Sequence, residues 1–147
     1  MDLILWRHAE AVDGIPDHYR VLTAKGIKQA EKISAFLAPQ LPDGYRVLAS
    51  PSARAQQTAA ILTDHFSIAP TIAPGASAHA VLQAAHWPES GGTVLVVGHQ
   101  PTLGEAAAQL LGCNGCSISI KKGGVWWFNL DRTGHISLRL VISPDLL

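Results

Sequence analysis

Arginine and histidine side chains follow three short apolar runs of the sequence, where they could act on a phosphate group. Arg7 and His8 follow the first run, Arg54 comes shortly after the second, and His99 follows the third. Guanidinium forks bind tetrahedral oxyanions through paired hydrogen bonds. Nearby positive charges lower the pKa of an imidazole and so keep it neutral and nucleophilic near pH 7. These residue types therefore predict phosphoryl transfer to a histidine.

The predicted reaction begins when one histidine attacks phosphorus in line. Water would then hydrolyse the phosphohistidine intermediate, while the arginines and the other histidine stabilise charge on the equatorial oxygens. This scheme needs no metal and no cofactor. The sequence lacks a G-x-x-x-x-G-K-[ST] phosphate loop and a paired carboxylate motif, which argues against P-loop hydrolases and two-metal phosphatases.

The elements that would position these residues alternate between strand-like and helix-like segments. This alternation predicts a single α/β domain over residues 1–147, with a mostly parallel sheet and helices on both faces. We expect strands at 2–6, 46–49 and 93–97, a poor strand between Pro70 and Pro74, and a β-rich C-terminal meander at 118–122, 125–130 and 136–142. Helices are expected from Thr23 to Pro39, from the Ser50 region to about residue 65, and over 77–86 and 101–112.

The candidate residues lie just after the carboxyl ends of three predicted strands. Ligands of open α/β sheets bind at that edge, so we expect Arg7, His8, Arg54 and His99 to meet there. Two of the three segments also begin a helix, whose N-terminal N–H groups attract anions. Phosphate is the expected ligand.

Composition limits the other functions open to the chain. Eleven basic residues balance eleven acidic ones among 147, so no overall field favours nucleic acid or an anionic membrane. No stretch approaches the ~20 apolar residues of a membrane span, and no signal peptide is visible, so a cytoplasmic location is expected. Cys113 and Cys116 form a lone C-x-x-C in a predicted turn, and we interpret them as loop thiols without a redox or zinc-binding role.

Four sequence blocks, in order along the chain, resemble the histidine phosphatase superfamily, which has the phosphoglycerate mutase-like fold. They are most similar to those of SixA-like phosphohistidine phosphatases, and Lys122-Gly123-Gly124 with Pro144 resembles that group's terminal sheet and tail. The blocks are Arg7-His8-Ala9-Glu10-Ala11, Leu22-Thr23-Ala24-Lys25-Gly26, Ser50-Pro51-x-x-Arg54-Ala55-x-Gln57-Thr58 and Val97-Gly98-His99-x-Pro101.

The resemblance implies a role for each matching residue. His8 would be the nucleophile, Arg7 and Arg54 would clamp the phosphate, and His99 would be the second imidazole. The substrate implied is phosphohistidine on a protein, such as a phosphotransfer domain. Many members of the superfamily carry an acid between the arginine helix and the second histidine, but residues 66–88 contain no Asp or Glu. Imidazole leaves phosphorus more easily than an alkoxide does, so the missing acid favours phosphohistidine.

Other candidate residues have more than one interpretation. Ser50 is expected to cap a helix and to support the pocket, while Arg20 and Glu10 are either solvated loop residues or the rim of the site. His79 and His86 are interpreted as surface histidines rather than metal ligands. A small-molecule phosphomonoesterase, with His79 or Glu10 as general acid, remains an alternative function. A non-catalytic phosphate-binding module is another alternative. The presence of His8 argues against it, because a protein that only binds phosphate does not need the nucleophile.

Overall fold

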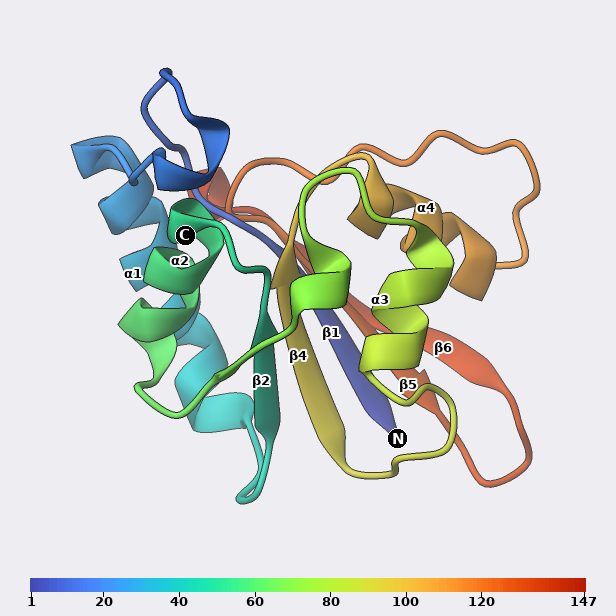
Figure 1. The fold of residues 1–147 in the computed structure, drawn as a ribbon. Coiled ribbons are helices and arrows are strands. Elements are labelled where there is room, and N and C mark those ends of the chain that lie inside the picture. The colour runs from blue at the N-terminus through green and yellow to red at the C-terminus, as the bar shows by residue number, and fades with distance from the viewer.

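The computed structural model describes residues 1–147, which are built around one six-stranded sheet of order β3-β2-β4-β1-β5-β6 (Figure 1). Strands β1 to β4 run parallel, β5 is antiparallel to β1, and β6 is antiparallel to β5. The strand bounds are β1 Asp2–Arg7, β2 Arg46–Ala49, β3 Ser67–Ile68, β4 Thr93–Gly98, β5 Val125–Leu130 and β6 Ile136–Ile142. The mostly parallel sheet predicted from the sequence is confirmed.

Two helices cover each face of this sheet, so the molecule has three layers (Figure 1). Helices α1 (Ala24–Leu37) and α2 (Ala53–Leu62) pack on one face, and α3 (Ala78–Ala84) and α4 (Thr102–Leu110) pack on the other. Short 3₁₀ helices are Asp17–Tyr19, Ala38–Gln40, Pro70–Ile72 and Pro144–Leu146. None of the helices is long and apolar enough to cross a membrane.

The core consists of two apolar clusters, one on each side of the sheet. Successive strand residues point to opposite faces, so Ile4 and Trp6 join the cluster under α1 and α2, whereas Leu3 and Leu5 join the cluster under α3 and α4. All six residues of β4 are buried, as expected for a central parallel strand. Burial of each large apolar side chain contributes about 1.5–3 kcal/mol, which holds the strand ends in fixed positions.

Three elements differ from the sequence-based prediction. Helix α2 ends at Leu62, so the chain is already extended at β3, while Pro70 begins a 3₁₀ helix where a strand was expected. The segment at 118–122 forms no strand, because β5 pairs with β1 directly and the carbonyls of Ile118 and Ile120 accept hydrogen bonds from side chains. The C-terminal part is thus a β5–β6 hairpin rather than a three-stranded meander.

The two cysteines lie in the loop after α4. The structure joins Cys113 to Cys116 in a disulfide, a pairing that the sequence alone left open. Their Cα atoms are 5.6 Å apart, a separation ordinary for bonded cysteines. No group of three or more His, Cys, Asp and Glu side chains is placed to share a metal ion.

Candidate active site

The carboxyl ends of three adjacent strands bring the candidate residues together. Strand β4 lies between β1 and β2, and its register pairs Gly98 with Arg7 and Val97 with Ala49. The next residue of each strand, His8, Ser50 or His99, therefore emerges at one edge of the sheet. The ring centroids of His8 and His99 are 5.1 Å apart. Arg54 lies in the first turn of α2, directly after this edge.

His8 is buried, and one of its two ring nitrogens is already engaged. Its Nδ1 lies 2.8 Å from the carbonyl oxygen of Ala9. A carbonyl only accepts hydrogen bonds, so Nδ1 carries the proton and Nε2 keeps its lone pair. The pKa of His8 is lowered to about 4, mainly by burial; the hydrogen bond with the Ala9 carbonyl opposes this lowering, and the charges of Arg54, Arg7 and Arg20 add to it. At neutral pH, His8 is an uncharged imidazole with a free Nε2.

Side chains of α2 hold the loop that carries His8. The hydroxyl of Thr58 accepts a hydrogen bond from the Ala9 N–H at 3.1 Å and donates one to the Arg54 carbonyl at 2.8 Å. Gln57 accepts from the Leu22 N–H at 2.8 Å. These contacts explain why Gln57 and Thr58 belong to the same sequence block as Arg54, although no individual role for either was predicted from the sequence.

Helix α1 supports the same loop from its N-terminus. Thr23 caps the helix by accepting from the Gly26 N–H at 2.9 Å, and its own N–H donates to the Glu10 carbonyl at 3.0 Å. A Cβ at Gly26 would collide with that carbonyl, so glycine is required for the close approach. Gln29 accepts from the Glu10 N–H at 2.9 Å. The Leu-Thr-x-x-Gly block therefore positions the chain that follows His8.

His99 is fixed by two serines at the end of β2. Its Nε2 lies 2.7 Å from Ser50 Oγ and 3.3 Å from Ser52 Oγ. The pKa of His99 is lowered to about 3, mainly by burial, and the proximity of His8 and of the Arg54 guanidinium contributes to the lowering. Ser50 is not the helix cap expected from the sequence, because α2 begins only at Ala53 and Ser50 faces His99 instead.

Arg54 is buried and is held by a residue that the sequence analysis did not identify. Its guanidinium donates to the Asp17 carbonyl at 3.0 Å and to the Asp17 carboxylate at 3.1 Å. Arg20 donates to the same carboxylate at 3.0 Å and to the Val12 carbonyl at 2.7 Å. Arg20 thus reaches the site through Asp17, whose pKa is lowered by its hydrogen bond with Arg20 and by Arg54. Only the fold reveals Asp17, because its loop matches none of the four blocks.

Arg7 and Arg54 each have one N–H group that forms no hydrogen bond within the protein. Arg7 donates through one terminal nitrogen to the Ile120 carbonyl at 2.8 Å. The Nε atom of each arginine is buried and has no hydrogen-bond partner in the protein. A buried guanidinium N–H without an acceptor is costly unless an anion meets it. Two such donors beside two neutral imidazoles make a site suited to phosphate.

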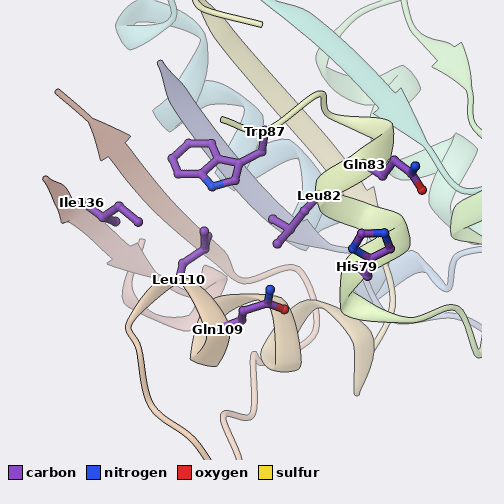
Figure 2. A pocket seen from close by; sticks show the side chains of 7 residues that line it. All are labelled: His79, Leu82, Gln83, Trp87, Gln109, Leu110 and Ile136. Atoms are coloured by element: carbon purple, nitrogen blue, oxygen red, sulfur yellow. The ribbon is translucent and has the colours of Figure 1, made fainter. Parts of the chain in front are cut away.

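Neither Glu10 nor His79, the two candidate acids, forms a hydrogen bond with His8 or His99. The Glu10 carboxylate accepts from the Thr23 hydroxyl at 3.0 Å and lies 3.8 Å from Lys25 Nζ, in a groove that Arg7 also lines. His79 is exposed and lines a hollow between α3 and α4 with Trp87 and Leu110, as Figure 2 shows. That hollow includes none of Arg7, His8, Arg54 and His99, so the structure gives His79 no contact with the site.

The two buried histidines predict a loss of stability in mild acid. The pKa of an unfolded histidine is about 6.5. Below that pH the unfolded chain therefore binds protons at both positions, whereas in the folded protein His8 and His99 stay unprotonated until the pH falls to about 4 and about 3, respectively. We expect the free energy of unfolding to fall by about 2–3 kcal/mol between pH 7.5 and 5.5, as measured by urea titration. The double variant His8→Gln/His99→Gln should lose much less over the same interval, and an equal loss would refute the burial of two neutral imidazoles.

Comparison with known proteins gives one family. Residues 3–77 match the model of the histidine phosphatase superfamily (branch 1). An uncharacterised protein of Picosynechococcus sp. is 35% identical over 136 residues, which span 85% of this chain and 82% of that protein. An uncharacterised protein of Mycobacterium tuberculosis is 34% identical over 125 residues, which span 78% of this chain and 75% of that protein.

Solved structures with the same fold include phosphatases of different specificity. The protein histidine phosphatase SixA, solved in complex with tungstate, is 26% identical, has a TM-score of 0.83, and is matched over 99% of both chains. A phosphoserine phosphatase mutant from Entamoeba histolytica, solved in complex with phosphoserine, is 18% identical with a TM-score of 0.74 over 99% of this chain and 98% of that one. The fold is therefore the phosphoglycerate mutase-like fold expected from the sequence.

Proposed function

The chain belongs to the histidine phosphatase superfamily, and from that premise we propose that it is a metal-independent phosphatase acting on phosphohistidine carried by a protein. The observation that carries this proposal is the arrangement of His8. Its Nδ1 is bound to the Ala9 carbonyl, which leaves a neutral Nε2 as the attacking atom. The tungstate complex of SixA supports a tetrahedral oxyanion as ligand, since tungstate and phosphate share that geometry.

The proposed reaction has two in-line displacements. In the first, His8 Nε2 forms a bond to phosphorus while the P–N bond of the substrate breaks, and the substrate imidazole leaves and takes up a proton from solvent. In the second, water attacks phosphorus and loses a proton to solvent, the bond to His8 breaks, and inorganic phosphate is released. The guanidiniums of Arg7 and Arg54 balance the charge on the equatorial oxygens in both steps.

His99 is suited to assist both displacements. The pKa of His99 is low in the free site because of burial and neighbouring positive charge. A bound phosphate dianion adds negative charge beside the ring and therefore raises that pKa. With this raised pKa, and with its ring held by Ser50 and Ser52, His99 can donate a hydrogen bond to the phosphoryl oxygens as they gain negative charge in the transition state.

The leaving group favours phosphohistidine over an alkyl phosphate. An alkoxide needs an acid to protonate it, and the carboxylate bound to Arg54 is Asp17. The lowered pKa of Asp17 keeps it ionised, so it is a poor proton donor near pH 7. Imidazole, in contrast, leaves without such help. The phosphoserine phosphatase with the same fold shows why the fold alone does not decide the substrate.

The test is phosphate release by EDTA-treated protein from a phosphohistidine-bearing phosphotransfer protein and from a panel of phosphomonoesters. We expect release from phosphohistidine to exceed ester hydrolysis by about 10²-fold or more in kcat/KM, since only the ester needs a general acid. Added divalent metal should leave the rate unchanged. The opposite preference would support a small-molecule phosphomonoesterase, and binding of phosphate without any release would support a non-catalytic module.

A further inference from the structure

Every lysine of the chain lines one groove beside the active site. The groove also contains Arg7, so it begins at the proposed phosphate clamp. The chain as a whole has eleven basic and eleven acidic residues, so this concentration of charge is local. The lysines are Lys25, Lys28, Lys32, Lys121 and Lys122.

The positive charge of this lysine groove is only partly neutralised. Its two acidic residues, Glu10 and Asp145, lie 3.8 Å from Lys25 Nζ and 3.5 Å from Lys121 Nζ, respectively. The other three lysines form no ion pair, and all five are exposed. Three of the five follow one another at spacings of three and four residues along α1, so they project from one side of that helix.

We propose that the lysine groove docks an acidic surface of the protein that carries the phosphorylated residue. This inference rests on the proposed function and extends it to a recognition surface. Arg7 belongs to both the clamp and the groove, so a partner held along the groove has its phosphate delivered to His8. Complementary charge of this kind raises the rate of association and selects among partners.

The chemistry of the groove fits an acidic protein better than a nucleic acid. No aromatic side chain lines it, and its one apolar lining residue is Pro144, so bases would find no aromatic stacking platform. Lysine ammonium groups are single point charges, which suit carboxylates spread over a surface.

The loop that contributes Asp17 to the site also carries exposed apolar side chains. Ile15 is 96% exposed and Tyr19 is 69% exposed, in the loop whose Asp17 binds Arg54. Exposed apolar groups beside a functional site are typical of a protein-binding surface.

The experiment compares one charge reversal in the groove with a matched reversal elsewhere. The groove variant is Lys28→Glu/Lys32→Glu, and the control is Arg46→Glu/Arg132→Glu, which changes the net charge equally at exposed sites outside the groove. For each protein, kcat/KM is measured with an acidic phosphohistidine protein and with phosphoramidate, over a range of salt concentrations.

We expect the groove variant to lose about tenfold or more in kcat/KM for the protein substrate at low salt, and to retain phosphoramidate hydrolysis within about twofold. Its rate should also depend less on salt than that of the wild type or the control. An equal loss with both substrates, or an equal loss in the control, would overturn the docking role. So would an unchanged rate with the protein substrate.

If the wild-type protein hydrolyses neither substrate, the proposed function is refuted, but the proposal that the lysine groove docks an acidic surface is not. In that case the ¹⁵N-labelled protein is titrated with a polyglutamate peptide. Backbone shifts confined to the lysine-bearing segments, and lost in the groove variant, would support the surface. Absent or scattered shifts would overturn it, as would binding of anionic lipid vesicles through these lysines without any response to the peptide.

Discussion

Replacement of His8 by alanine is expected to lower kcat by about 10⁴-fold or more, because the variant lacks the atom that attacks phosphorus. The arginine clamps do not depend on this imidazole, so the affinity for phosphate or vanadate should change by no more than about threefold. The measurement is single-turnover phosphate release, together with calorimetric titration of the anion.

The control for this variant is His65→Ala, which removes an exposed histidine outside the site. That variant should keep the wild-type rate. Hydrolysis by His8→Ala at a rate near that of the wild type would remove His8 as the nucleophile. A loss of anion binding equal to the loss of rate would give His8 a binding role instead.

Replacement of Arg54 by alanine is expected to weaken both binding and turnover. Arg54 is buried, and its Nε–H has no acceptor in the protein, so it can give a phosphate a charge-assisted hydrogen bond. We expect kcat/KM to fall by about 10²–10³-fold, as for the loss of one donor that stabilises transition-state charge. Phosphate affinity should fall in parallel, as measured by competition with substrate.

Two further variants separate electrostatics from geometry and folding at this position. Arg54→Lys keeps the charge but loses the planar fork that binds Asp17, so we expect partial recovery of affinity and little recovery of kcat. Arg132→Ala, an exposed arginine in the β5–β6 turn, should behave as the wild type. Unaltered phosphate affinity in Arg54→Ala would place Arg54 outside the site.

The sequence predicted the parallel part of the fold because the relevant signals are local. Strands β1, β2 and β4 are short apolar runs. Thr23 and Ser77 are residue types that favour the start of a helix, and their hydroxyls do cap α1 and α3. The carboxyl ends of parallel strands share one edge, so a strand-end position was enough to predict that the two histidines would meet.

The remaining features depend on contacts between distant residues, which no local pattern contains. The segment at 118–122 has the composition of a strand, yet its carbonyls accept hydrogen bonds from Arg7 at the end of β1 and from Gln100 just before α4. Asp17 begins a single 3₁₀ turn and becomes part of the site only because Arg54 and Arg20 bind it. The lysine groove joins residues about ninety positions apart in sequence, so composition alone showed a neutral chain.

The central claim is that phosphate passes through a covalent bond to His8. The direct measurement is rapid quenching of the wild-type reaction with labelled phosphohistidine protein at alkaline pH, followed by mass spectrometry to locate the phosphorylated residue. The account predicts a transient phosphoenzyme on His8 that forms and decays fast enough to sustain turnover. Turnover without any phosphoenzyme, or with phosphate on another residue, would contradict it.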